Sequence, residues 1–253
     1  MSPTTPIIHL TSVDSTNAEA MRRALAGGPT PLWIRADRQE RGRGRSGRPW
    51  QSEPGNLYAS LLLQLGCPAE NAAQLSLVTG VAVVDAINEL ASQSLAGQTS
   101  GALPGLQLKW PNDILIDGAK VGGILIESTR QGVTLVVVIG IGLNLVTHPA
   151  DLDRRVTRLN LHNIQADPEL MLCYVSQHMD RWLGIWQEGA GRVACQQAWL
   201  ERATPLGTLL SINAGGGPVT GTFQGLDHDG ALLLQTSTGR QRFSFGDVTL
   251  AGL

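Results

Sequence analysis

The chain has 253 residues, of which 42% are hydrophobic and 16% are charged. These proportions are typical of a globular protein with a sizeable core, and they exclude an intrinsically disordered chain. The formal net charge is −2, which argues against general nucleic-acid binding because such domains usually carry a basic excess. The three widely spaced cysteines suggest neither a disulfide framework nor a CxxC site. We therefore expect a cytoplasmic protein, and no segment of the sequence is expected to span a membrane.

The first two thirds of the chain alternate helical and extended patterns. Thr16 and Glu19 have the spacing of a helix capping box, and a Gly-Gly-Pro sequence at 27–29 ends that helix. Pro68 opens a long helical pattern to about residue 91. Apolar runs predict strands at 32–36, 57–65, 106–109, 114–116, 121–127 and 134–139, with a tight turn at 117–118 and a linker over 97–105.

The last third of the chain changes in texture near residue 203. Helical patterns over 168–187 and 193–202 carry three tryptophans that we expect in the core. Short apolar runs follow, separated by glycines, and they predict a small β-barrel. We therefore predict a mixed α/β (α+β) fold with a largely antiparallel sheet, divided into a domain over 1–203 and a small barrel over 204–253. The tryptophans are Trp182, Trp186 and Trp199, and the runs are 206–212, 219–226, 231–235 and 240–245.

Residues 42–50 interleave three glycines with three arginines and end on Trp50. Glycine lets the backbone approach a ligand closely. One guanidinium group can bind two oxygens of a carboxylate or phosphate at once. An indole ring offers a face on which a purine can stack. The segment thus predicts an anion-binding loop, and the alternatives are an ordinary exposed Arg-Gly loop or a disordered segment that binds nucleic acid.

Of the nineteen basic residues, only Lys109 and Lys120 are lysines. A genome biased towards arginine would spare those lysines whose chemistry arginine cannot copy, because lysine presents a compact charge on a flexible stem. Both lysines therefore draw attention as functional groups. As a single charge on a strand beside a turn, Lys120 is expected to contribute little to stability.

Four blocks of sequence resemble the biotin protein ligase family (biotin–[acetyl-CoA-carboxylase] ligases) in order, spacing and residue identity. They are the loop 42–50, Asp-Ser-Thr-Asn at 14–17, the stretch 109–127 with its Lys-Trp-Pro-Asn-Asp and Lys-Val-Gly-Gly sequences, and Gly-Ile-Gly-Leu-Asn at 140–144. The likeness is strongest over residues 8–146. It implies a catalytic domain like that of class II synthetases and a small C-terminal barrel like Src-homology-3 domains. The chain departs from the usual pattern at Glu40, Arg41 and Pro49.

The resemblance implies a ligase that biotinylates one lysine of a biotin carboxyl carrier protein. In that reaction biotin and MgATP form biotinyl-5′-AMP and pyrophosphate, and the carrier lysine then attacks the adenylate. Magnesium is expected to enter with ATP rather than at a dedicated protein site, and the five histidines receive no role. We expect no DNA-binding or repressor activity, since there is no room for a helix-turn-helix module before Asp14. A homodimer is compatible with the resemblance.

Site residues are carried over position by position from the family pattern. The resemblance implies catalytic roles for Lys120, Arg43, Arg45 and Asp113. It places biotin against Ser15, Thr16, Asn17, Gln39, Gly42, Arg43, Arg45, Lys120, Gly122 and Gly123. It places ATP or the adenylate against Arg45, Arg48, Trp50, Asn112, Lys120 and Asn144.

Several of these positions have simpler interpretations. Ser15 and Thr16 could be helix caps, and Asn112 with Asp113 could form a turn before a strand. The pair Gly122-Gly123 indicates a close approach of the backbone to a ligand or to another strand.

Three other functions compete with the ligase. A lipoate or octanoate transferase shares the fold but does not account for the whole loop 42–50. A nucleic-acid-binding module would show affinity that falls steeply with salt. A biotin-binding protein without catalysis would not require so many cations around a carboxylate. For the ligase we expect the loop 42–47 to order over the bound adenylate.

Overall fold

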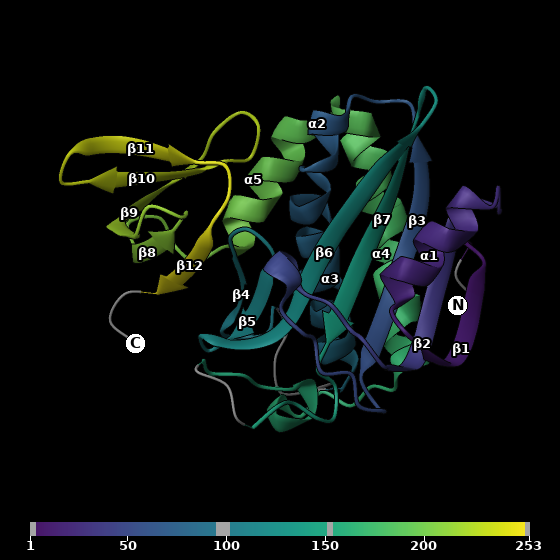
Figure 1. Cartoon of the computed structure of the whole chain (residues 1–253). Coiled ribbons are helices and arrows are strands. Elements are labelled where there is room, and N and C mark those ends of the chain that lie inside the picture. The colour runs from purple at the N-terminus through teal and green to yellow at the C-terminus, as the bar shows by residue number, and fades with distance from the viewer. Residues whose placement is uncertain (1–3, 95–101, 151–153, 251–253) are drawn as a thin grey trace.

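A computed structural model describes residues 4–94, 102–150 and 154–250, and two sheets form its framework (Figure 1). In the larger sheet only the first two strands, in chain order, are parallel, and every other pair is antiparallel. This confirms the predicted mixed and largely antiparallel sheet. Its strands, in spatial order, are β1 (Ile7–Val13), β2 (Leu32–Gln39), β3 (Leu57–Leu65), β7 (Thr134–Leu143), β6 (Ala119–Gln131), β5 (Asp113–Ile116) and β4 (Leu106–Lys109).

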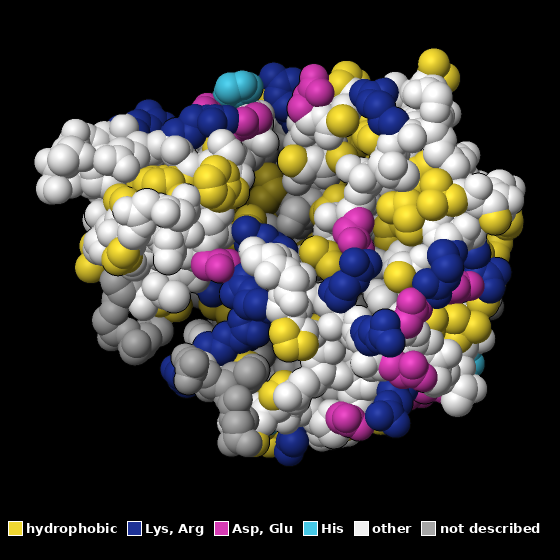
Figure 2. All heavy atoms as spheres, in the orientation of Figure 1, with side chains coloured by type: hydrophobic (Ala, Val, Ile, Leu, Met, Phe, Trp, Pro, Cys, Tyr) yellow, Lys and Arg dark blue, Asp and Glu magenta, His cyan; other side chains and the backbone are white. Residues whose placement is uncertain are grey.

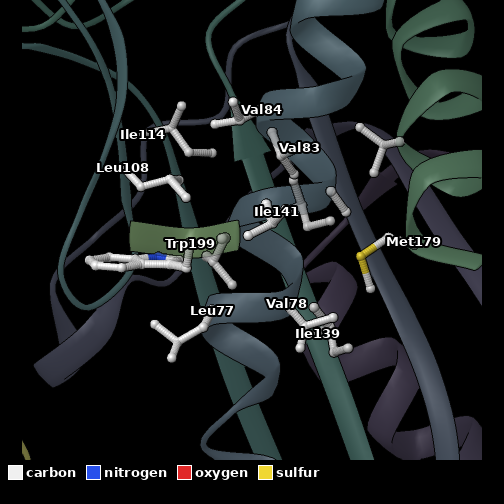
Figure 3. Close-up of a cluster of buried hydrophobic side chains, with 14 of the residues drawn as sticks. Leu77, Val78, Val83, Val84, Leu108, Ile114, Ile139, Ile141, Met179 and Trp199 are labelled. Atoms are coloured by element: carbon white, nitrogen blue, oxygen red, sulfur yellow. The ribbon is translucent and has the colours of Figure 1, made fainter. Parts of the chain in front are cut away.

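Helices cover both faces of this sheet, because successive strand residues point to opposite sides. Leu62 of β3 and Val138 of β7 pack against α1 (Thr16–Leu25). Leu61 of β3 and Ile139 of β7 face the larger core on the other side, where Figure 3 shows side chains of β7 beside Leu77 and Val78. The helices of that side are α3 (Leu75–Ser94), α4 (Pro168–Trp186) and α5 (Arg192–Arg202).

The stretch Ala69–Gln93 is long and apolar enough to cross a membrane, with a mean hydropathy of 1.4. In the fold, 72% of its most apolar part is buried. Its helix α3 packs against the large sheet and against its neighbours α4 and α5. Packing inside the protein therefore accounts for its apolar surface.

The smaller sheet follows α5 and is antiparallel throughout. Its inward side chains, such as Ile212 and Phe223, belong to the same hydrophobic core as α3. Several hydrogen bonds join it to the main body; for example, the amide of Gln196 donates to the carbonyl of Asp227 at 3.1 Å, and the indole of Trp110 donates to the carbonyl of Gly230 at 3.0 Å. Its strands, in spatial order, are β11 (Gly239–Phe243), β10 (Leu232–Thr236), β9 (Pro218–Leu226), β8 (Leu209–Asn213) and β12 (Asp247–Leu250).

Most predicted elements are present, with several differences. The N-cap of α1 is Ser15 rather than Thr16, because the Ser15 hydroxyl accepts from the backbone of Ala18. The long helix is broken into α2 (Ala69–Ala72) and α3, and the strands β1 and β12 were not predicted. The tight turn is confirmed by positive φ angles at Asp117 and Gly118, and the three tryptophans are buried as expected. Much of the linker 97–105 lies outside the described residues, and the boundary at 203 stays a prediction.

Three short 3₁₀ helices complete the described chain. They are η1 (Arg45–Gly47), η2 (Leu159–His162) and η3 (Gln187–Gly189). The first lies within the predicted anion-binding loop, where Ser46 has a φ of 55° and Gly47 a φ of 71°. The loop therefore makes a tight left-handed turn between its second and third arginines.

Candidate active site

A pocket of about 220 Å³ opens on the face of the large sheet that carries α1. Its walls come from the N-terminus of α1, the loop after β2, the strands β5, β6 and β7, and the start of β12. Figure 2 shows Lys and Arg side chains gathered beside a hollow where the small sheet meets the main body. The sequence-predicted residues on its walls are Ser15, Thr16, Asn17, Gln39, Arg43, Arg45, Arg48, Trp50, Asn112, Asp113, Lys120 and Gly123.

The floor of the pocket is made of glycines in β6 and β7, where Gly123 pairs with Gly142. A Cβ atom on Gly142 would lie 2.7 Å from the ring of Trp50, and one on Gly123 would lie 3.2 Å from it. Two bare backbone positions thus let the indole lie directly against the sheet. Gly122 is different, since a Cβ there would meet Leu143 and lie 3.0 Å from the carbonyl oxygen of Gly142. For Gly122 the close approach is therefore to the neighbouring strand, and this residue does not line the pocket.

One end of the pocket is held by neutral hydrogen bonds. The backbone amide and the hydroxyl of Thr16 both donate to Oε1 of Gln39, at 2.9 and 3.1 Å. The hydroxyl of Ser60 lies 2.7 Å from Oγ1 of Thr16 and 2.6 Å from Oδ1 of Asn17. Thr16, Asn17 and Ser60 are all buried. Groups that are buried and already oriented in this way can recognise a polar, uncharged ring.

The same network continues into the loop. Nε2 of Gln39 donates to the hydroxyl of Ser52 at 3.0 Å, and that hydroxyl donates to the carbonyl of Trp50 at 3.0 Å. A Cβ atom on Gly42 would lie 2.6 Å from the same hydroxyl, and the carbonyl of Gly42 accepts from the backbone of Trp50 at 2.9 Å. Gly42 therefore shapes the base of the loop and is not on the pocket wall.

The other end of the pocket gathers positive charge. Arg45 donates to Oδ1 of Asn112 at 3.1 Å and to the carbonyl of Gly246 at 3.0 Å. Arg48 donates to Asp247 at 2.7 Å. Burial lowers the pKa of the Arg45 guanidinium, which still stays charged because arginine titrates far above neutral pH. Two loop arginines are thus tied to the small sheet at the start of β12.

Both lysines of the chain meet at one carboxylate. Lys109 lies 3.0 Å from Asp113, and Lys120 makes a short hydrogen bond to the other oxygen of Asp113. Burial opposes ionisation of Asp113, but the charges of Lys120 and Lys109 hold its pKa below the usual value. Burial lowers the pKa of Lys120, and Asp113 partly opposes that shift. The expectation that Lys120 is a single charge of little structural weight is wrong, because its buried ammonium is paired.

Trp50 lines both the main pocket and a smaller hollow of about 70 Å³. The ammonium of Lys120 lies 5.3 Å from the centre of the Trp50 ring, which is a cation–π distance. Asn144 lines the smaller hollow and donates to the carbonyl of Thr157 at 3.0 Å. Arg154 lines both cavities. Asn144 therefore lines the smaller hollow together with Trp50 and not the wall of the main pocket.

Sequence reasoning missed several wall residues. Asp247, Val248 and Thr249 come from β12, more than a hundred residues away from any block that carried the resemblance. Arg154 lies in a segment without a motif, where a parallel bridge joins Val156 to Lys120. Lys109 could have been added, since the scarcity of lysine marked it together with Lys120. Other wall residues that were not predicted include Trp110, Gly140 and Gly142.

The described residues also include a cluster of metal-ligand type away from the pocket. Asp227, His228 and Asp229 bring three ligand atoms within 4.8 Å of one another. They lie at a turn of the small sheet, and Arg242 pairs with both carboxylates. The cluster is thus accounted for as a surface ion-pair group.

The order of these blocks along the chain matches a known family. The model of the biotin/lipoate A/B protein ligase family matches residues 10–144, which contain nearly every element of the pocket. The chain belongs to this family. The model of the biotin protein ligase C-terminal domain matches residues 211–250, so the small sheet with β12 is also a recognised part of such ligases.

Relatives and solved structures agree with this family membership. A biotin–[acetyl-CoA-carboxylase] ligase of Paracoccus denitrificans is 36% identical over 96% of this chain and 100% of its own length. The bifunctional ligase/repressor BirA of Bacillus subtilis is 31% identical over 96% of this chain and 74% of its own length. The biotin protein ligase of Aquifex aeolicus in complex with biotin and ATP superposes with a TM-score of 0.79 at 29% identity, over 96% of this chain and 97% of that one. The ligase fold predicted from the sequence is therefore confirmed.

Proposed function

We propose that this protein is a biotin–[biotin carboxyl-carrier protein] ligase, which activates biotin with ATP and transfers it to a lysine of a carrier protein. The observation that carries the proposal is the polarity of one pocket. Its α1 end offers neutral, buried hydrogen-bonding groups, and its loop end gathers Arg45, Arg48, Lys109 and Lys120. A substrate with an uncharged polar ring at one end and a carboxylate at the other complements both ends.

The neutral end favours biotin over lipoate. The ureido group of biotin has two N–H donors and a carbonyl acceptor, whereas the dithiolane ring of lipoate has no strong hydrogen-bonding group. Thr16, Asn17 and Gln39 already hydrogen-bond to protein groups. Lipoate would remove solvent from their remaining polar capacity without offering a hydrogen bond in return, and such groups discriminate against a ligand that cannot engage them. The lipoate or octanoate transferase is thus the weaker alternative.

The charged end suits the first step. A carboxylate oxygen of biotin attacks the α-phosphorus of ATP, a new P–O bond forms, and the bond to the β-phosphate oxygen breaks to release pyrophosphate. Two anions must approach each other, so fixed cations are needed where negative charge builds up. We assign Arg43 and Lys120 to the carboxylate and the α-phosphate, and Arg45 and Arg48 to the phosphate chain. Magnesium enters with ATP as part of that substrate.

The remaining predicted residues receive roles by position. Asn112 holds Arg45, and its amide nitrogen donates to the carbonyl of Ile124 at 2.7 Å. Asp113 sets the two lysines beside the phosphates, and Trp50 with Asn144 is assigned to the adenine side. In the second step the amine of the carrier lysine attacks the acyl carbon, an amide forms and AMP leaves.

The proposal extends to partners and location. The carrier is assigned to the biotin domain of an acetyl-CoA carboxylase, as in the name of the Paracoccus relative. That relative is named as a ligase only, whereas BirA of Bacillus subtilis is named as a ligase and repressor. In line with the first name, we propose a ligase without repressor activity, located in the cytoplasm. Gel-shift measurements with operator DNA test the first point. Sedimentation at several protein concentrations tests whether the protein forms a homodimer.

Biotin-dependent exchange of labelled pyrophosphate into ATP tests the proposed function. We expect exchange with biotin and none with lipoate or octanoate. Incubation with ATP, biotin and a carrier domain should add the mass of one biotinyl group to that domain. Exchange that ignores biotin, or that lipoate supports equally well, would overturn the proposal.

A further inference from the structure

One carboxylate outside the pocket wall connects its two ends. Glu127 lies on β6, on the same face as Gly123 and Leu125 of the pocket. Its Oε2 atom accepts from the amide of Asn17 at 2.8 Å and from the guanidinium of Arg43 at 3.1 Å. A single oxygen thus joins the neutral end of the site to the arginine loop.

This contact fixes the orientation of the Asn17 amide. The nitrogen of Asn17 also donates to the carbonyl of Leu125 at 3.3 Å, while its oxygen lies 2.6 Å from the hydroxyl of Ser60. Glu127 therefore accepts the shorter of the two hydrogen bonds from that nitrogen. Since an ionised carboxylate can only accept, it strongly favours the rotamer that points the nitrogen towards β6 and the oxygen towards Ser60.

Arg43 is the second group that Glu127 holds. Its side chain is 46% exposed and extends from a loop that contains three glycines. Within the described part of the chain, Glu127 is the carboxylate that pairs with it. A long side chain on such a loop would otherwise sample many rotamers, and ordering it on binding costs free energy.

A carboxylate so close to a site for an anionic substrate needs a reason. Alone it would repel biotin, but the pairing with Arg43 neutralises it. We infer that Glu127 is a positioning residue, which sets the amide of Asn17 and the guanidinium of Arg43 at a fixed separation before biotin binds. The inference rests on the proposed function, because it assigns both groups to one substrate.

The test compares Glu127→Ala and Glu127→Gln with the unchanged protein in biotin-dependent pyrophosphate exchange. We expect the KM for biotin to rise about tenfold in Glu127→Ala, since a charge-assisted contact is lost on each side. Glu127→Gln keeps an acceptor for Asn17 and should show a smaller rise. The KM for ATP should stay within about twofold, whereas kcat should also fall, because Arg43 is assigned to the groups that react in the first step. Glu201→Gln, which removes an exposed carboxylate beside Arg202, is the matched control and should change nothing.

A double-mutant cycle with Arg43→Gln separates positioning from a general effect on the fold. If Glu127 acts through Arg43, Arg43→Gln should raise the KM for biotin strongly in the unchanged protein. The same substitution should raise it far less in the Glu127→Ala protein. Biotin titration without ATP should reproduce the same non-additivity. The isosteric Glu127→Gln protein allows the cycle to be completed if Glu127→Ala does not fold.

Two results would overturn the inference. One is a KM for biotin within twofold of normal in both variants, and the other is strict additivity with Arg43→Gln. Each leaves the proposed function intact, provided that the unchanged protein shows biotin-dependent exchange. If the unchanged protein shows no exchange, the proposed function fails at that step and the role of Glu127 fails with it.

Discussion

The two ends of the pocket are built in different ways. The neutral end is formed by buried side chains of α1 and β3 and the half-buried Gln39 of β2, linked by hydrogen bonds between uncharged groups such as Thr16 and Ser60. The charged end is formed by Arg45, Arg48 and a lysine pair, and it reaches the small sheet. The first end is built from consecutive elements near the N-terminus, α1 to β3, whereas the second spans elements from distant parts of the chain.

The difference indicates how each end performs its task. Rigid neutral groups in a low-dielectric setting select a ring by geometry, because an unpaired buried group is costly. Charges near the surface attract and hold phosphates over a longer range but are weakened by solvent and salt. Lys120 and Asp113 are the exception, since they are charged and buried. Substitutions at the neutral end should therefore have effects that do not depend on salt, whereas the effects of substituting exposed charges at the other end should weaken as salt is added.

The largest effect is expected for Lys120→Met, which keeps the stem of the side chain and removes its charge. We expect biotin-dependent exchange to fall by at least about a hundredfold, the usual cost of losing a donor aimed at developing charge. Because Asp113 keeps Lys109 as a partner, the protein should fold with reduced stability in urea. Activity within tenfold of normal would refute the role of Lys120.

Asp113→Asn should have the largest effect on stability. It leaves two lysine charges without their carboxylate, and breaking a buried ion pair costs about 3 kcal/mol or more. Urea unfolding at pH 7 measures the loss. A difference below about 1 kcal/mol would mean that the lysine pair is solvated and that the charged end resembles an ordinary surface.

The loss of stability in Asp113→Asn should also depend on pH. The pKa of Asp113 is lowered in the folded protein, so the unfolded chain takes up a proton first as the pH falls. The stabilisation by Asp113 is therefore complete above the unfolded value of about 4 and is lost as the pH falls towards the folded value. The difference in unfolding free energy between Asp113→Asn and the unchanged protein should shrink below pH 4. A difference that does not change between pH 7 and pH 3 would contradict this.

Gly142→Ala tests the glycine floor that both ends share. The new methyl group would lie 2.7 Å from the ring of Trp50, so the indole must move at a cost of about 1–3 kcal/mol. Tryptophan fluorescence and the KM values for biotin and ATP should change together. Gly184→Ala is the matched control, since no atom beyond its chain neighbours and the backbone of its own helix lies within 4 Å of its Cβ position in α4, and helix propensity favours alanine.

Asp247→Asn should have the smallest effect. The side chains of Arg48 and Asp247 are 45% and 49% exposed, so their ion pair is expected to contribute less than about 1 kcal/mol. The contribution of this ion pair to the free energy of unfolding should disappear as the salt concentration is raised. Thr16→Val, at the neutral end, should lower the free energy of unfolding by about 1 kcal/mol at every salt concentration. Equal salt sensitivity of the two variants would remove the distinction between the ends.

Prediction from the sequence worked best where a local pattern and a block of motif coincided. The strands β3 and β4 have the predicted bounds. A long apolar run determines β3 locally, and the four-residue β4 leads directly into the block of motif that starts at Lys109. The strand β1 was missed, since this edge strand is half exposed and its pattern is weak. The four-residue strand β12 was missed because it is short and is stabilised by pairing with β8.

The residues of the candidate site also fall into two groups, those that the sequence placed correctly and those whose role only the structure shows. Ser15, Thr16, Gln39, the three loop arginines and Lys120 were all found from blocks of sequence, and all line the pocket. Gly42 and Gly122 were placed on the wall by resemblance, but the structure uses them to let chain segments approach each other. A glycine in a motif shows that space is needed, and only the fold shows what fills that space.

By itself, the sequence determined the residue types of the site, the order of its blocks and the family to which the chain belongs. Those properties depend on local chemistry and on spacing along the chain. The tertiary structure decided that Lys109 shares Asp113 with Lys120, that β12 closes the charged end, and that Glu127 joins Asn17 to Arg43. These pairings depend on strand register and on contacts between distant segments, which no local pattern in one sequence encodes.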